Sequence, residues 1–174
     1  MAELPSYLLA KSYFDVHEYD RASFVLASSK SSKSQFLHLY ARYIAGEKRK
    51  DEDSEMVLGP LDGAVTGNKE LQGILAALEV IFAEKVEDDW VEDDSWLLFL
   101  YGIVLFKHKN ENEARGALIR SVNLYPYNWS AWQELGATIG TLSDVGNLFP
   151  TLILRVLTPM KSLTTSSNPC RTTS

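Results

Sequence analysis

A phrase of small, aromatic and apolar residues recurs along this chain at fixed spacing, and it limits the folds open to the chain. Near the middle, Tyr101 and Gly102 lie in an apolar helical pattern, and Ala114 follows twelve residues after the glycine. Pro126 closes the phrase, and Gly136 lies 34 residues beyond Gly102. Because two helices approach most closely where a side chain is a hydrogen or a methyl group, the spacing predicts a helix pair that crosses at the glycine and the alanine.

A period of about 34 residues with this punctuation is typical of tetratricopeptide repeats, in which each unit is a pair of helices. One pair cannot bury its apolar face alone and needs neighbouring pairs. We therefore predict an all-α fold, a short right-handed solenoid of helical hairpins with a disordered C-terminal tail. The residues predicted to pack at helix crossings and unit ends are Ala10, Ala22, Ala41, Gly102, Ala114, Pro126, Trp132 and Gly136.

The first predicted units occupy residues 5–45. Their first helix is expected to begin behind Pro5, and Ala22 again lies twelve residues after Ala10, on a second helix. A third helical pattern follows. It is predicted to end at Gly46, because glycine is common immediately after the last turn of a helix.

The middle of the chain interrupts the repeat. Residues 46–68 are charged and then punctuated by Gly and Pro, which predicts a mobile loop insertion. Residues 69–94 combine an amphipathic helix with an acidic linker, which we interpret as solvated or as attractive to a basic partner. Either Asp94 or Ser95 is expected to cap the next helix. A regular unit is then predicted at residues 95–128.

The C-terminal part departs from the repeat. Residues 129–157 begin as a fourth unit but lack the alanine expected on its second helix, so this unit is predicted to be incomplete. Trp129, Trp132 and Leu135 are therefore expected to be incompletely buried. Residues 158–174 are dominated by Thr, Ser and Pro, and such composition predicts disorder.

Composition excludes several classes of function. The 174 residues are 45% apolar and 23% charged, as in a globular domain. A net charge of −6 disfavours binding to nucleic acid or to an anionic membrane. There is one cysteine, no leading signal segment and no apolar run of about 18 residues, so we expect no disulfide and no membrane span. The predicted location is the nucleus and the cytoplasm.

Residue types that carry chemistry are scattered. His17, His38 and His108 lie far apart without a second metal ligand nearby and are interpreted as surface residues. Cys170 has no positioned base, and residues 63–69 match a phosphate-binding loop poorly. The sequence therefore predicts no catalytic residue, no metal ligand, no cofactor and no small-molecule substrate. The many aromatic residues exceed what a short array must bury, which predicts an exposed face for association.

Several longer phrases point to one family. They are Leu9–Val16, Glu18–Ala22, Arg42–Asp51, Leu58–Leu61 and Leu100–Leu105. In order and spacing they resemble the N-terminal region of the family of subunit 8 of the anaphase-promoting complex (the cyclosome), over residues 7–144. Residues 145–174 resemble nothing in that family, and a truncated, alternatively spliced or frame-shifted product is the simplest explanation.

The resemblance implies a non-catalytic scaffold subunit of a ubiquitin ligase that acts at the transition from metaphase to anaphase. It also implies that these repeats form a homodimer and contact other subunits of the complex, whereas the groove for activator tails lies in later repeats. The alternative is a free-standing tetratricopeptide adaptor that binds a client peptide. A complex subunit should self-associate through a large apolar face, and an adaptor should be monomeric with a polar groove.

Overall fold

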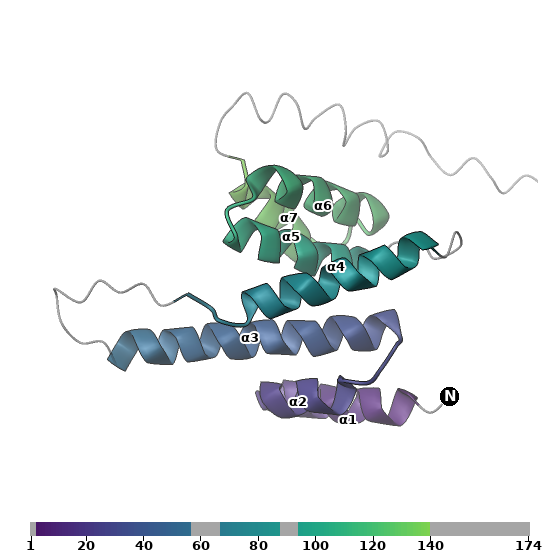
Figure 1. Cartoon of the computed structure of the whole chain (residues 1–174), viewed down its shortest axis with the longest axis vertical. Coiled ribbons are helices and arrows are strands. Elements are labelled where there is room, and N and C mark those ends of the chain that lie inside the picture. The colour runs from purple at the N-terminus through teal and green to yellow at the C-terminus, as the bar shows by residue number, and fades with distance from the viewer. Residues whose placement is uncertain (1–2, 57–66, 88–93, 140–174) are drawn as a thin grey trace, which may run out of the picture. The chain divides into compact units, whose positions relative to one another are not determined.

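The computed structural model describes residues 3–56, 67–87 and 94–139 of the chain. In these ranges every regular element is an α-helix, which confirms the predicted all-α class. The described residues as far as Thr138 belong to one compact unit, and it contains all the helices of the described ranges (Figure 1). The helices are α1 (Glu3–Asp15), α2 (Tyr19–Leu26), α3 (Ser32–Met56), α4 (Leu71–Glu87), α5 (Ser95–Lys107), α6 (Glu111–Leu124) and α7 (Trp129–Ala137).

Each helix packs mainly on its neighbours in the sequence. Helices α1 and α2 form one hairpin and α5 and α6 form another, and these two pairs make the most extensive contacts together with α2 and α3. Helix α3 also contacts α1, α4 and α5, and α7 packs on α6. Such a chain of local contacts is expected of helical repeats, in which each unit covers the next.

A glycine, Gly102, lies at the point where α5 and α6 approach each other most closely. A Cβ atom on Gly102 would lie 2.6 Å from Leu118 Cγ and 3.3 Å from the carbonyl oxygen of Ala114. Gly102, Ala114 and Leu118 are all buried, so the backbones approach as closely as these side chains permit. The α1–α2 hairpin has the same spacing, and Ala10 and Ala22 are both fully buried in it.

The two hairpins also share one turn. His17 and Lys109 lie seven residues after Ala10 and Gly102, and their φ angles are 64° and 63°. In each turn the next amide donates to the carbonyl oxygen five residues earlier, Glu18 N to Tyr13 O at 2.9 Å and Asn110 N to Leu105 O at 3.0 Å. This hydrogen bond defines a Schellman helix end, for which glycine is the preferred residue at the left-handed position.

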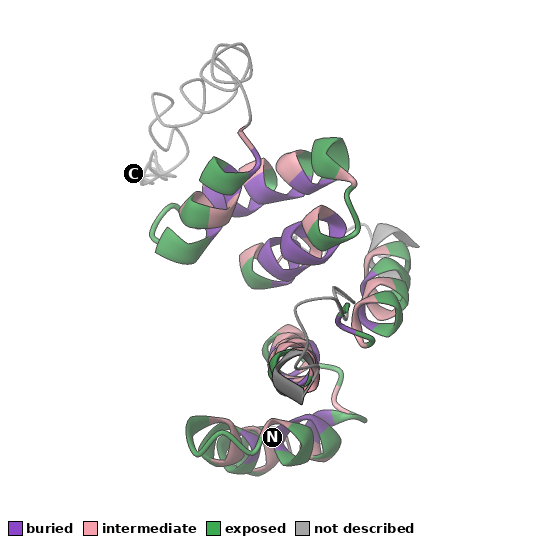
Figure 2. Cartoon of the chain, turned by 90° about the vertical axis from the view of Figure 1, so that its left-hand side faces the viewer, coloured by how far each residue is buried: buried purple, intermediate pink, exposed green. Residues whose placement is uncertain are grey.

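Helix α5 lies in the main core. Eight of its thirteen residues are buried, so it is shielded nearly all round (Figure 2). The fully buried side chains of this core come from α3, α4 and α5 and are Leu39, Ile74, Leu78, Leu97, Leu100 and Val104. A smaller cluster of Ala10, Leu26 and Leu37 joins α1, α2 and α3.

The predicted end of the third helix at Gly46 is wrong, because α3 continues to Met56. Gly46 is buried within the helix, and a Cβ atom on it would lie 2.7 Å from Asn68 Cγ. The glycine therefore makes room for a side chain from the start of the next segment. The predicted loop insertion at residues 46–68 is accordingly helical as far as residue 56, and its residues 57–66 lie outside the described ranges.

The side chain of Asn68 fills the space beside Gly46, which we call the notch, and hydrogen bonds hold it there. Its Nδ2 donates to Tyr43 O at 3.2 Å and to Glu47 Oε1 at 2.9 Å, and its Oδ1 accepts from Glu70 N at 2.9 Å. Only 8% of Asn68 is exposed, so these three bonds satisfy a buried amide. Asn68 thus fixes the point at which the chain returns to α3 before α4 begins.

Other predicted boundaries differ less. Helix α1 begins at Glu3 and includes Pro5, because the first-turn amides of a helix have no intrahelical partner and proline costs nothing there. The predicted cap at Asp94 is confirmed, since its Oδ1 accepts from Trp96 N at 2.8 Å. Helix α4 ends at Glu87, and the remainder of the predicted linker, residues 88–93, lies outside the described ranges.

The fourth unit is described only for α7. Trp129 is 71% exposed, as expected, but Leu135 is 2% exposed, so the prediction of its incomplete burial is wrong. Leu135 lies four residues after Ala131, and both are buried on the face of a helix that packs on α6. The predicted remainder of this unit and the predicted disordered tail lie outside the described residues.

The positive φ of Lys109 predicts that glycine at this position stabilises the fold. Lys109→Gly should raise the free energy of unfolding by about 1 kcal/mol, because glycine adopts a positive φ without steric cost. Lys107→Gly, two residues earlier in the last turn of α5, should lower it by about 0.5–1 kcal/mol. Urea unfolding of both variants measures the difference. Equal destabilisation by the two substitutions would contradict the left-handed turn.

The notch at Gly46 predicts a conditional effect. Gly46→Ala should lower the free energy of unfolding by about 1–3 kcal/mol, because the added methyl displaces Asn68 from its hydrogen bonds. In an Asn68→Ala background the same substitution should be neutral or stabilising, since alanine favours the helix. Thermal unfolding of the two single variants and the double variant gives the coupling. Additive effects would show that the two residues do not interact.

Candidate protein-interaction surfaces

Helix α1 presents an apolar surface to solvent. It packs on α2 and α3 through Ala10, with Tyr7 and Phe14 beside it. Leu4 and Leu8 lie four residues apart and therefore on one side of α1, and Val16 follows directly after the helix ends; they are 64%, 54% and 66% exposed. We call these three residues, together with the half-exposed Leu9, the α1 surface.

A series of aromatic rings runs from the α1–α2 hairpin over α3 to the α5–α6 hairpin. We call it the aromatic ladder, and each ring lies 5.1–6.1 Å from the next between centroids. In order, its members are Tyr19, Phe14, Tyr40, Phe36, Trp96, Tyr125 and Tyr127. Such ring pairs contribute about 0.5–1.5 kcal/mol each beyond the burial of their area.

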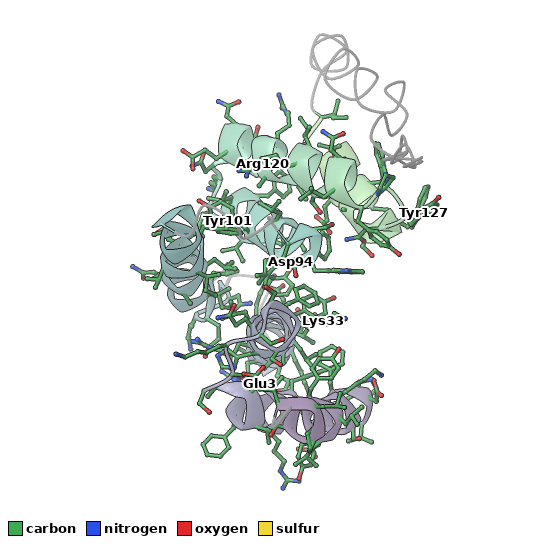
Figure 3. The ribbon with its side chains drawn as sticks, turned by 90° about the vertical axis from the view of Figure 1, so that its right-hand side faces the viewer. Glu3, Lys33, Asp94, Tyr101, Arg120 and Tyr127 are labelled. Carbon is green, nitrogen blue, oxygen red and sulfur yellow. The ribbon has the colours of Figure 1, made fainter. Side chains whose placement is uncertain are left out.

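The rings of the ladder on α1 and α3 are less exposed than its last ring, Tyr127. Phe14, Phe36 and Tyr40 are half-buried and contact the helical cores. Tyr127 is 85% exposed and projects from the turn between α6 and α7 (Figure 3). The rings on α1 and α3 therefore contribute to the packing of the array, and Tyr127 presents aromatic surface to solvent.

Opposite charges tie α2, α3 and the start of α4 together. Arg42 Nη2 lies 2.7 Å from Glu70 Oε2, and Arg49 joins Glu70 at 3.0 Å and Asp20 at 2.6 Å. Hydrogen bonds from Arg42, followed by those from Arg49, hold the pKa of Glu70 below its ordinary value. Arg49 belongs to the short basic run at residues 48–50, and each of the three cations has an acidic partner.

The interpretation of His38 as a surface residue is wrong. Its Nδ1 lies 3.0 Å from Ser23 Oγ and 2.8 Å from Ser23 O, and the ring is half-buried between α2 and α3. Burial lowers the pKa of His38, so the neutral imidazole is favoured in the fold. His17 and His108 are exposed, as expected. The sequence signal for this burial was the pair of apolar neighbours, Leu37 and Leu39, which are both buried and show that His38 lies on a packed helix.

Some of the predicted packing residues lie in the core and others lie at the surface. Ala10, Ala22, Ala41 and Ala114 are fully buried, and Gly102 lies beside Ala114 at the crossing of α5 and α6.

The remaining packing residues lie at the beginning of the fourth unit. The carbonyl oxygen of Pro126 accepts a 2.8 Å hydrogen bond from Trp132 Nε1. Gly136 is exposed, and no atom lies within 4 Å of a Cβ built on it. Among the described residues it therefore makes no close helix contact.

No catalytic constellation emerges from the described ranges. Within them, no group of three or more His, Cys, Asp and Glu side chains could hold a metal ion. The helices in the same ranges include none that is both long and apolar enough to cross a membrane. Cys170 and most of the weak phosphate-loop match lie outside these residues.

Comparison with known proteins identifies relatives from plants, animals and fungi. A family model described as Anaphase promoting complex subunit 8 / Cdc23 matches residues 1–174. The Arabidopsis thaliana protein named Anaphase-promoting complex subunit 8 is 44% identical over 142 residues, 82% of this chain and 24% of the relative. The Homo sapiens protein named Cell division cycle protein 23 homolog is 39% identical over 133 residues, 76% of this chain and 21% of the relative.

A fungal relative shows that the similarity extends to lower sequence identity. The Saccharomyces cerevisiae protein named Anaphase-promoting complex subunit CDC23 is 27% identical over 186 aligned positions, 82% of this chain and 29% of the relative. The chain thus spans about a quarter of the length of the relatives it matches. The expectation that the resemblance ends near Asp144 is wrong for the family model, whose match continues to residue 174. On the extent of this match, the chain belongs to the anaphase promoting complex subunit 8 / Cdc23 family.

Proposed function

We propose that the chain is a non-catalytic scaffold of the anaphase-promoting complex that acts in the control of cell division. In this proposal it forms a homodimer through its first two units and contacts other subunits of the complex. The names of its relatives support the assignment to the complex. The single observation that carries the dimer is the α1 surface, where Leu4 and Leu8 on the first described helix and Val16 directly after it remain exposed.

The energetics favour covering this surface. Burying an exposed leucine or valine side chain contributes about 1.5–3 kcal/mol, and a two-fold interface counts each residue twice. A stable interface buries about 1,600 Å² in total, which is more than one helix of 13 residues offers. We therefore extend the proposed interface from α1 to the adjoining surfaces of α2 and α3.

The remaining parts of the proposal concern what the chain does not bind. A net charge of −6 and the pairing of its basic run at residues 48–50 support an association with proteins in place of nucleic acid or anionic lipid. We further propose that the chain uses no cofactor and no small-molecule substrate, and that it works in the nucleus and the cytoplasm.

Sedimentation of the purified 174-residue chain tests the dimer. At tens of micromolar the chain should sediment as a dimer, and Leu8→Lys should weaken self-association at least tenfold, because it places two charges in an apolar interface. Val80→Lys is the matched control, since Val80 is 56% exposed on α4. This variant should dimerise like the parent.

A parent chain that is monomeric at these concentrations would refute the dimer and favour the adaptor. Equal weakening by Leu8→Lys and Val80→Lys would place the interface elsewhere. Circular dichroism of both variants, compared with the parent, separates loss of association from loss of fold.

A further inference from the structure

A groove runs between the turn that joins α1 to α2 and the C-terminal half of α3. In Figure 1, α3 extends beyond the α1–α2 hairpin on the side where that turn lies. Two hollows, of about 170 and 500 Å³, lie there, and His17, Tyr19, Lys48 and Glu52 line both. Because the hollows share these four residues, they form one depression, which we call the α2–α3 groove.

One wall of the groove is apolar. Ile44 on α3 and Tyr19 at the start of α2 line the larger hollow, and both residues are only half-buried. The ring of Tyr19 is contacted by Phe14 at 5.1 Å and by His17 at 5.8 Å between centroids. These contacts restrict the motion of the Tyr19 ring, so the apolar wall is present before a partner binds.

Carboxylates outnumber cations among the described residues that line the groove. The carboxylates are those of Glu18, Asp20, Glu47, Asp51 and Glu52, and the cations are those of Lys48 and Arg49. Arg49 is already paired, with Asp20 at 2.6 Å and with Glu70 at 3.0 Å. The groove therefore has a negative balance of charge, and its field attracts a cation.

Glu52 is the carboxylate best placed to accept a new donor. It lines both hollows, and its ion pair with Lys48 is 4.0 Å long between side chains that are 61% and 60% exposed. This distance is too long for a hydrogen bond, and an exposed pair of this kind contributes little to stability. Glu47, by contrast, accepts a hydrogen bond from Asn68 Nδ2 at 2.9 Å. Glu52 can therefore exchange Lys48 for an incoming cation with little loss of free energy.

We infer that the α2–α3 groove binds a segment of a partner protein that carries basic side chains beside apolar ones. The methylene stem of an arginine or lysine lies along apolar surface while its charged end stays polar, so the stem fits Ile44 and Tyr19 and the end fits Glu52. An excess of carboxylates repels nucleic acid. The basic run of this chain at residues 48–50 is itself paired, so a second copy is a poorer occupant.

Fluorescence anisotropy tests the groove in the 174-residue chain. The probe is a dansyl-labelled peptide of sequence Leu-Arg-Ser-Arg-Leu, and the matched control replaces both arginines by citrulline, which keeps the shape and removes the charge. At physiological ionic strength the arginine peptide should bind saturably, and the citrulline peptide should bind about fivefold more weakly or less. Equal binding of the two peptides, or no saturation with the arginine peptide, would overturn the inference.

Variants test where the peptide binds. Glu52→Gln should weaken binding of the arginine peptide about threefold, and Asp51→Asn together with Glu52→Gln about tenfold, as expected for exposed ion pairs. Glu111→Gln, on the first turn of α6, removes the same charge outside the groove and should leave binding unchanged. Equal weakening by Glu52→Gln and Glu111→Gln would show a response to net charge alone and would overturn the groove as the site. Circular dichroism checks that each variant keeps its fold.

Leu8→Lys separates binding in the groove from the proposed dimer. Leu8 is not among the residues that line the groove, so this variant should bind the arginine peptide with the same Kd as the parent chain. Peptide binding by a parent chain that is monomeric would refute the dimer and leave the groove standing. Loss of peptide binding by a folded Leu8→Lys variant would place the peptide at the dimer interface and overturn the groove as the site.

Discussion

The close crossing of paired helices is the constraint on which the rest of the array depends. At Gly102 the backbone of α5 comes so near to Leu118 and the Ala114 carbonyl that no Cβ atom fits without a shift. This contact sets the spacing of α5 and α6, and α5 then fills the main core on its other faces. The α1–α2 hairpin repeats the arrangement with Ala10 and Ala22, which are also fully buried.

Helices α3 and α4 are joined differently, and polar groups replace part of the packing there. A long α3 extends past Gly46, and Asn68 enters the notch that the glycine leaves. Arg42 and Arg49 then hold Glu70 at the start of the next segment. Buried amides and paired guanidinium groups contribute to stability only when each hydrogen bond is satisfied, so this junction specifies where the insertion rejoins the array.

The repeat, the hairpins and the small residues at their crossings could be predicted because they depend on spacing within about 34 residues. The role of Gly46 could not, since a glycine that ends a helix and one that admits a side chain look alike in sequence. Leu135 was misjudged because burial on one helix face needs only one partner, α6. The Asn68 anchor joins segments more than twenty residues apart in the chain, and no local pattern reports which side chains meet there.

The direct test of the hairpin register compares two glycines of one hairpin. Gly102→Ala should lower the free energy of unfolding by about 1–3 kcal/mol, because the methyl overlaps Leu118. Gly116→Ala, on α6 with no atom within 4 Å of the added Cβ, should raise it by about 0.5–1 kcal/mol through helix propensity. Urea unfolding of both variants beside the parent measures the contrast. Equal stabilisation by the two substitutions would contradict the close crossing and the repeat register built on it.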